Sequence, residues 1–291
     1  MEVSVQQHLL PAIVVLVMCT IGMELRWEQF QALIRAPRTP IIGTLIHTLT
    51  FPMLAMLLVV ALQTMEFTVS DSTVIGMLLI AACPSGGFSN VLALIARVNL
   101  PLSVTLTLVS SLLSFATVPL LIGGFGFFIA DLDQPVQIPV VATLQQLCVL
   151  ILLPIGAGMA IRRWQTAFVE SHLARMQNLG QVALYICVVL LIVENWSVMV
   201  AGVMDALPWS ILLCGANILT CYYLAQWTGF VLEDRITIAL EGSIRNIAVA
   251  LLIAATVMQR MDIAVLPTVY FLAVLIVALL FAKTWRLLFK A

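Results

Sequence analysis

Long apolar runs separated by short polar connections cover most of the chain. Each run comes close to the roughly 20 residues that an α-helix needs to cross the hydrocarbon core of a bilayer. Nine such runs lie at about residues 8–25, 39–62, 72–98, 101–129, 138–161, 179–201, 208–230, 234–258 and 265–280. The pattern predicts a single all-α polytopic membrane domain with about nine transmembrane helices.

Prolines and polar residues predict where these helices begin and how they are connected. Pro101 and Pro208 stand near the starts of the fourth and seventh runs, where a first-turn proline fits a helix. Residues 26–38 carry aromatic and apolar side chains at helical spacing, which is typical of an amphipathic helix at the membrane interface. We expect a turn at 131–135, and at 162–178 the longest loop, formed by a surface helix.

Two of the apolar runs are interrupted in the same way. The third contains Cys83-Pro-Ser-Gly-Gly-Phe-Ser-Asn90, and the eighth contains Glu241-Gly-Ser-Ile-Arg-Asn246. Aligned 156 positions apart, the six residues from Ser85 and from Glu241 share a glycine in second place and an asparagine in sixth. Paired interruptions in corresponding spans indicate the binding site of a transporter built from inverted repeats. We therefore expect two broken helices that cross near the middle of the membrane.

The eighth run also contains two charged residues, Glu241 and Arg245. Each charge near the bilayer centre costs roughly 2.5 to 3.5 kcal/mol on insertion scales, so intramembrane charges usually have partners and a function. One interpretation is a structural ion pair, because the two residues are four positions apart on a helix. The other is a functional site in which the carboxylate faces a protein-lined cavity.

Hydroxyl and amide side chains near the interruptions are candidates for a cation site around Glu241. Hard monovalent cations prefer oxygen ligands, and neutral oxygens with one carboxylate suit an ion such as Na⁺. Ser103 and Thr107 are one helical turn apart and can face the third run together. The alternative is that these hydroxyls bond carbonyls of their own helix or hold helices together. The candidate ligands are Ser89, Asn90, Ser103, Thr107 and Glu241.

Composition and charge narrow the class of protein further. The chain has 291 residues, of which 63% are hydrophobic and only 9% charged, whereas a soluble domain has about 25% charged residues. A net charge of -1 argues against a nucleic-acid partner, and the hydrophobic composition makes the lipid bilayer the expected surroundings. No Cys-x-x-Cys occurs among the six cysteines, so neither a metal site nor a disulfide framework is indicated.

The basic residues predict the orientation of the chain in the membrane. Loops on the cytoplasmic side are enriched in Lys and Arg. With nine spans, alternate loops and the C-terminal tail hold eleven of the thirteen basic residues, and the opposite loops are acidic. We therefore expect an external N-terminus and a cytoplasmic C-terminus.

The interrupted runs resemble those of the bile acid:sodium symporter family. The resemblance is carried by the segment from Cys83 to Asn90, by Leu102-Ser-Val-Thr-Leu-Thr107, and by the segment from Glu241 to Asn246. It implies a nine-span form of the fold, in a bacterial inner (plasma) membrane. It also implies a panel domain made of spans 8–25, 138–161 and 179–201, and a core domain made of the other six spans. The function implied is sodium-coupled transport of a small organic anion by alternating access.

Carried over residue by residue, the family's first sodium site coincides with the five candidate cation ligands, Glu241 included. The second site is altered, because the family has glutamines where this chain has His47 and Arg245. Both replacements can carry positive charge, so we expect one Na⁺ site to be intact and the other to be replaced. The substrate-facing positions implied by the resemblance are Ser85, Gly86, Gly87, Phe88, Asn217 and Asn246.

Three other functions remain open at this point. A transporter of the same fold with proton coupling or no coupling would use His47 and Arg245 differently. An intramembrane enzyme has little support, since the chain has no His-x-x-x-His spacing, no nucleotide-binding loop and no nucleophile beside Glu241 and His47. A channel would have no need of paired broken helices. Neither the identity of the transported anion nor the oligomeric state follows from the sequence.

Overall fold

The computed structural model describes residues 5–25, 38–129, 145–146 and 148–289. The described part of the chain is helical, and its only β-pairing is an isolated antiparallel bridge between Ser85 and Arg245. The predicted interface helix at 26–38 lies almost wholly outside the described residues, and the predicted turn at 131–135 lies wholly outside them. The fold is that of an all-α polytopic membrane protein.

The first half of the chain ends with a long, bent helix. Its elements are η1 (Val5–Leu9), α1 (Leu10–Glu24), α3 (Arg38–Thr64), α4 (Asp71–Ala82), α5 (Phe88–Ala96) and α6 (Leu100–Ile129). Pro101 occupies the second position of α6, as the sequence predicts. The helix bends by 62° between its parts Leu100–Ser114 and Ala116–Phe125. Pro119 explains this bend, because its ring crowds the carbonyl four residues earlier and it has no N–H to donate there.

The second half contains the longest helices and the second interruption. Its elements are η2 (Cys148–Leu152), α8 (Leu153–Trp164), α9 (Thr166–Glu194), α10 (Trp196–Trp227), α11 (Leu232–Ser243), α12 (Ile247–Leu252), η3 (Ile253–Val257) and α13 (Val265–Phe289). Five described helices are long and apolar enough to cross a membrane, or six with the bent α6. Two further predicted spans are the interrupted pairs α4–α5 and α11–α12, and the fifth is described only at residues 145–146 and from η2 onward.

Two predictions about the second half need correction. Residues 162–178 are mostly helical and exposed, as predicted, but they do not form a separate connection, because α8 continues to Trp164 and α9 runs from Thr166 into the sixth span. The seventh span does not begin at Pro208, which lies inside α10, and the chain turns instead at Asn195. The acidic Asp205 stays within α10 because Ser70 and Thr73 donate hydrogen bonds to its carboxylate.

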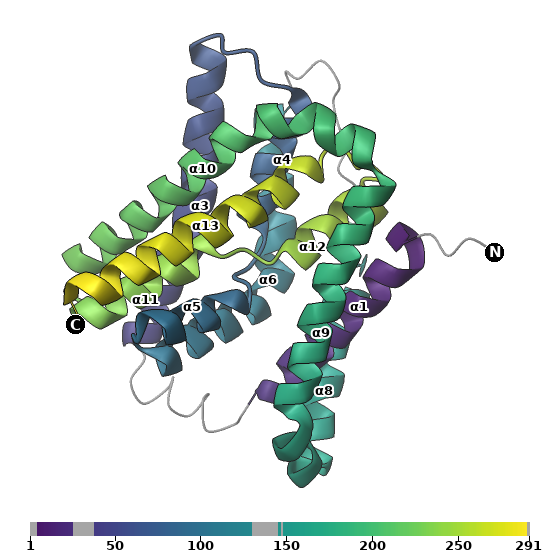
Figure 1. Ribbon diagram of the computed structural model, residues 1–291, viewed down its shortest axis with the longest axis vertical. Coiled ribbons are helices and arrows are strands. Elements are labelled where there is room, and N and C mark those ends of the chain that lie inside the picture. The colour runs from purple at the N-terminus through teal and green to yellow at the C-terminus, as the bar shows by residue number, and fades with distance from the viewer. Residues whose placement is uncertain (1–4, 26–37, 130–144, 147, 290–291) are drawn as a thin grey trace.

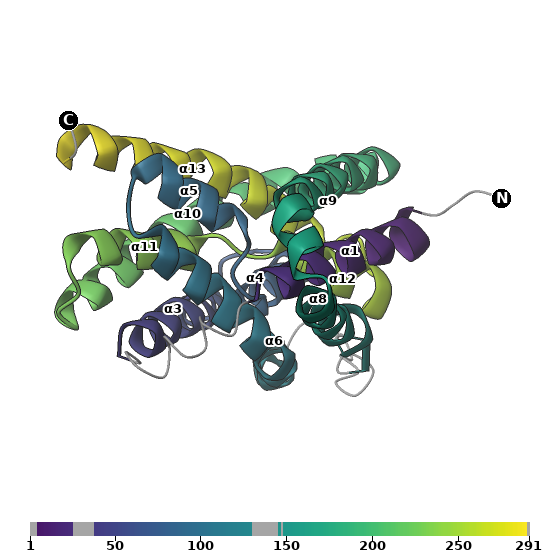
Figure 2. The same cartoon turned by 90° about the horizontal axis from the view of Figure 1, so that it is seen from below.

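The helices form two groups that meet along the interrupted segments. In both views α1, α8 and α9 gather on one side, while α3, α5, α10, α11 and α13 lie on the other (Figures 1 and 2). Glycines let α1 and α8 touch backbone to backbone. A Cβ atom at Gly22 would lie 2.1 Å from the carbonyl oxygen of Ile155, and one at Gly158 would lie 2.1 Å from that of Cys19. Whether the groups move as panel and core domains stays a prediction.

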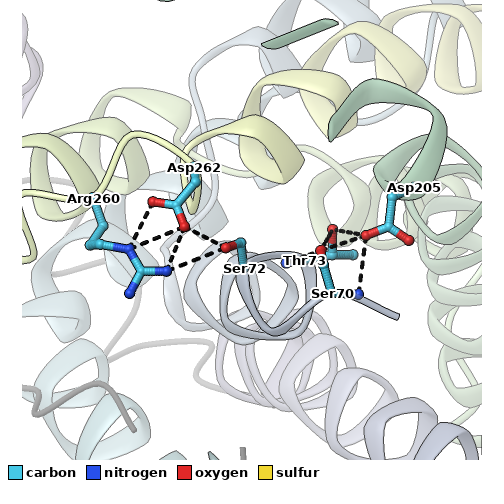
Figure 3. A network of polar contacts seen from close by, with 6 residues as sticks. All are labelled: Ser70, Ser72, Thr73, Asp205, Arg260 and Asp262. Atoms are coloured by element: carbon cyan, nitrogen blue, oxygen red, sulfur yellow. Dashed lines mark hydrogen bonds and ion pairs between the residues drawn. The ribbon is translucent and has the colours of Figure 1, made fainter. Parts of the chain in front are cut away.

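A polar network fixes the N-terminal end of α4 to its neighbours (Figure 3). Asp205 of α10 accepts hydrogen bonds at Oδ2 from the Ser70 hydroxyl at 2.6 Å and the Thr73 hydroxyl at 2.7 Å. Asp262, in the connection before α13, accepts one from Ser72 and forms an ion pair with Arg260 at 2.5 Å. The network therefore joins three elements at the end of α4 far from the interruption.

The network predicts a pH-dependent contribution of Asp262 to stability. Hydrogen bonds from Arg260, followed by that from Ser72, lower the pKa of the Asp262 carboxyl to about 2, below its ordinary value near 3.9. The stabilisation is complete above the ordinary pKa and is lost as the pH falls toward the folded-state pKa. We expect Asp262→Asn to lower the melting temperature near neutral pH, and the difference from the parent to shrink as the pH falls below about 4.

Thermal unfolding of the parent, Asp262→Asn, Arg260→Gln and the double variant measures this effect. The double variant is expected to be no less stable than either single variant, because each single change already removes the ion pair. A difference between parent and Asp262→Asn that widens on acidification would contradict the prediction.

Candidate functional site

The two interrupted segments lie side by side and pair through their backbones, as the sequence predicts. The N–H of Gly86 donates to the carbonyl oxygen of Ile244 at 3.1 Å, and that of Asn246 donates to Pro84 at 2.8 Å. The segments approach closely, because a Cβ atom at Gly86 would lie 3.0 Å from the carbonyl oxygen of Arg245. The crossing lies at the centre of the molecule, between α11 and α12 and between α4 and α5 (Figure 1).

The carbonyl groups at the end of α11 need partners, because the helix stops inside the protein. Asn217 of α10 donates from Nδ2 to the Gly242 oxygen at 2.7 Å, and the Tyr270 hydroxyl of α13 donates to the Ser243 oxygen at 2.5 Å. Asn217, predicted to face the substrate, is fully buried and uses its amide within the protein. Sequence reasoning missed Tyr270, and its only signal was a phenol in an apolar span.

The carboxylate of Glu241 is fully buried and surrounded by side-chain oxygens. Its Oε1 accepts hydrogen bonds from the Ser85 hydroxyl and from the Thr107 hydroxyl at 2.5 Å. Its Oε2 accepts one from the Ser103 hydroxyl at 2.9 Å, and Ser103 lies equally close to Asn90 Oδ1. Ser89 Oγ is 3.3 Å from Thr107 Oγ1. We call this group the Glu241 cluster: Ser85, Ser89, Asn90, Ser103, Thr107 and Glu241.

The Glu241 cluster brings together all five predicted ligands and one residue that was predicted elsewhere. The sequence motifs predict Ser85 at the substrate-facing surface, but in the structure its hydroxyl contacts Glu241. The serines farther along α6 behave differently, since each bonds a carbonyl of its own helix. These serines are Ser110, Ser111 and Ser114. These three serines therefore satisfy carbonyls of α6 and do not belong to the Glu241 cluster.

The Glu241 cluster has fewer hydroxyl protons than oxygen acceptors. Ser103 has one proton and two acceptors within 2.9 Å, Asn90 Oδ1 and Glu241 Oε2. Thr107 has one proton and faces Glu241 Oε1 at 2.5 Å and the Ser103 carbonyl oxygen at 3.1 Å. A buried acceptor without a donor costs about 1–3 kcal/mol, so a bound cation or an additional proton would stabilise the cluster.

Arg245 is buried at the crossing but does not pair with Glu241. Among the described residues no salt bridge joins these two side chains, and the hydrogen-bond partners of the guanidinium are backbone carbonyls. The interpretation of Glu241 and Arg245 as a pair on one helix face is therefore wrong. The reason is that α11 ends at Ser243, so the extended segment turns Arg245 away from the face that carries Glu241.

The guanidinium of Arg245 is held by backbone carbonyls and an aromatic ring. Its Nη1 donates to the Cys83 oxygen at 3.2 Å and its Nη2 to the His47 oxygen at 2.8 Å. The Cζ atom lies 4.6 Å from the centroid of the Phe51 ring, a cation–π geometry. The two predicted replacements of the second ion site, Arg245 and His47, are thus in direct contact, although through the backbone of His47.

Gly87, one of the other predicted substrate-facing residues, lies next to α9. Gly87 precedes α5 without a side-chain cap, and the atom nearest to a Cβ placed there is Gln181 Nε2 of α9, at 3.8 Å. Phe88 is only partly buried. Asn246 caps α12, because its Oδ1 accepts the N–H of Val249 at 3.4 Å.

The donor set of the Glu241 cluster is that of a hard monovalent cation. Within the described ranges, no group of three or more His, Cys, Asp or Glu side chains lies close enough together to hold a metal ion. Transition metals prefer imidazole and thiolate ligands, whereas hydroxyl, amide and carboxylate oxygens suit alkali and alkaline-earth ions. A single carboxylate matches the charge of one monovalent ion.

Comparisons with known proteins identify relatives of this chain. The chain is 30% identical over 138 residues to the uncharacterized sodium-dependent transporter YocS of Bacillus subtilis, over 44% of this chain and 41% of the relative. It is 31% identical over 214 residues to the uncharacterized protein PA2026 of Pseudomonas aeruginosa (68% and 59%). It is 29% identical over 145 residues to the human sodium/bile acid cotransporter 4 (50% and 31%). The matches thus span between about a third and three fifths of the relatives' own lengths.

A family model supplies the broader assignment. The model of the sodium bile acid symporter family matches residues 11–202, which include the first interrupted segment and the start of α6. The match covers about two thirds of the chain and agrees with the resemblance seen in the sequence motifs. The chain therefore belongs to the sodium bile acid symporter family.

Proposed function

We propose that this protein is a sodium-coupled symporter of a small organic anion that works by alternating access. The observation that carries the proposal is the Glu241 cluster. In it a buried carboxylate is surrounded by oxygen atoms, and the hydrogen-bond acceptors outnumber the hydroxyl protons. Na⁺ would supply the missing positive charge and accept oxygen ligands without requiring a rigid geometry. The names of two relatives, a sodium-dependent transporter and a sodium/bile acid cotransporter, support the same ion.

Arg245 takes the place of a second sodium ion in this proposal. Its guanidinium sits against the carbonyl oxygens of Cys83 and His47, the kind of ligand that a cation would otherwise use. Cys83 terminates α4, so the charge lies at the negative end of that helix. Arginine keeps its proton in essentially any protein environment. The protein would therefore transport one sodium ion per cycle, while the charge of Arg245 stays fixed in place of a second ion.

The anionic substrate would bind beside the crossing, on the side that faces α9. Gly87 leaves room there, and Asn246 can offer its amide Nδ2, since its Oδ1 is used to cap α12. Gln181 of α9 is the nearest polar side chain to Gly87. A site between α9 and the crossing would open to one side or the other when the two helix groups move relative to each other.

Proton coupling is the second candidate, because the same shortage of protons in the Glu241 cluster could be met by protonation of Glu241. An enzyme is excluded by the family, which consists of secondary transporters. The proposal places the protein in a bacterial inner membrane, with its N-terminus external and its C-terminus cytoplasmic.

Thermal unfolding of the purified protein across a sodium titration tests the proposal without a known substrate. Potassium replaces sodium to hold ionic strength constant. A ligand that binds only the folded state stabilises it by about 2.7 kcal/mol at one hundred times its dissociation constant, so the melting temperature should rise with sodium. A melting temperature that responds to pH and not to sodium would favour proton coupling. A melting temperature that responds to neither would contradict both sodium coupling and proton coupling.

A further inference from the structure

Ser85 connects the two unusual charges of the crossing. Its side chain is buried, and its hydroxyl donates a hydrogen bond to Oε1 of Glu241. Its backbone forms the isolated β-bridge with Arg245, flanked by the Gly86–Ile244 hydrogen bond. Ser85 belongs to the α4–α5 interruption, whereas Glu241 and Arg245 belong to the other broken helix. It therefore ties the carboxylate to the opposite segment.

The hydroxyl of Ser85 differs from its neighbours in how it is bonded. Thr107 and Ser89 each also bond a backbone carbonyl, that of Ser103 and that of Gly86 respectively. Within the described part of the chain, the only hydrogen-bond partner that the structure gives Ser85 Oγ is Glu241. A hydroxyl that donates its proton keeps two lone pairs, so Ser85 Oγ can accept a cation while it still bonds the carboxylate.

We propose that Ser85 is an additional oxygen ligand of the cation bound at Glu241. The inference rests on the proposed function of the Glu241 cluster as a sodium site. The cation would then be held by α6, by α11 and by the segment between α4 and α5 together. Binding of the ion would fasten the two broken helices to each other through Ser85 in addition to their backbone pairing.

Two roles of the hydroxyl predict opposite signs when it is removed. As a ligand, Ser85 stabilises the ion-bound state, and its loss weakens sodium binding. If Ser85 only donates a hydrogen bond to the Glu241 carboxylate when no ion is bound, its hydroxyl competes with sodium for that carboxylate. Its loss then strengthens sodium binding. A hydrogen bond to a charged group is worth about 1.5–3 kcal/mol. The loss of a ligand of that strength corresponds to roughly a tenfold or larger change in affinity.

The experiment compares sodium titrations of Ser85→Ala, Ser85→Thr and the parent, read as melting temperature at constant ionic strength with potassium. Ser85→Ala is expected to raise the sodium midpoint roughly tenfold. Ser85→Thr keeps the hydroxyl, and its branched side chain suits the extended segment, so the midpoint should stay within about twofold of the parent. Ser110→Ala is the matched control, because Ser110 is a buried serine of α6 that bonds only the Thr107 carbonyl.

The outcomes separate this inference from the proposed function. A parent protein that sodium does not stabilise overturns both. A parent that sodium stabilises, with an unchanged or lower midpoint for Ser85→Ala, overturns only the role of Ser85. So does failure of Ser85→Thr to restore the parent midpoint, since packing and not the hydroxyl would then explain the loss. Should Ser85→Ala not fold, Ser85→Gly replaces it in the same titration.

Discussion

Sodium is expected to raise the melting temperature of the parent protein but not that of Glu241→Gln. Glu241 is the only carboxylate of the Glu241 cluster, so the variant leaves a bound ion without a counter-charge in a buried site. At one hundred times the dissociation constant, the stabilisation lost is about 2.7 kcal/mol. This is the largest single effect that we expect from a change to the Glu241 cluster.

The same variant should remain folded in the absence of sodium. The glutamine amide adds two N–H donors to a cluster whose acceptors outnumber its protons. We therefore expect its melting temperature in potassium to be no lower than that of the parent. Sodium titrations followed by tryptophan fluorescence measure both quantities, since the chain has six tryptophans.

Two milder variants and one control complete the series. Asn90→Ala and Thr107→Ala each remove one neutral oxygen and should raise the sodium midpoint without abolishing the response. Glu194→Gln changes an exposed carboxylate at the end of α9 and should leave the midpoint unchanged. The proposed site is wrong if Glu241→Gln binds sodium as well as the parent does.

The convergence of the cation ligands could be predicted from sequence because it depends on local spacing. Ser103 and Thr107 are one turn apart on a helix, and both do face Glu241. The position of Ser85 depends on where each helix breaks, which spacing does not reveal. The motifs align 156 positions apart, yet the second half-helices begin at Phe88 and Ile247, 159 positions apart (247 minus 88). In the structure Ser85 lies in the extended segment before α5, and its hydroxyl contacts Glu241.

Helix boundaries in the second half depend on hydrogen bonds to residues of other helices, which the local sequence around each boundary does not reveal. Asp205 and Pro208 together are typical of a loop, but Ser70 and Thr73 of α4 satisfy the carboxylate, and α10 continues. Arg245 was expected one turn from Glu241 for the same local reason. The paired backbones of the crossing replace that turn by an extended segment.

The second large effect is expected from Arg245→Gln combined with His47→Gln. The double variant removes the fixed charge and leaves the carbonyl oxygens of Cys83 and His47 without their guanidinium donor. Those oxygens, together with the new amides, would form a second site for sodium. Removal of a nearby positive charge should also strengthen the first site. We expect sodium binding with a Hill coefficient above one, against a value near one for the parent.

A competing interpretation is that Arg245 binds the substrate carboxylate, for which its planar fork is well suited. The double variant would then lose affinity for the anion, and its sodium dependence would stay shallow. The geometry favours the fixed-charge interpretation, because Arg245 is only 3% exposed and directs both terminal nitrogens at backbone carbonyls. His47→Gln alone is the control, because the guanidinium and its bond to the backbone of residue 47 remain, so its Hill coefficient should stay near one. A parent protein with clearly cooperative sodium binding would rule out a single mobile sodium ion under either interpretation.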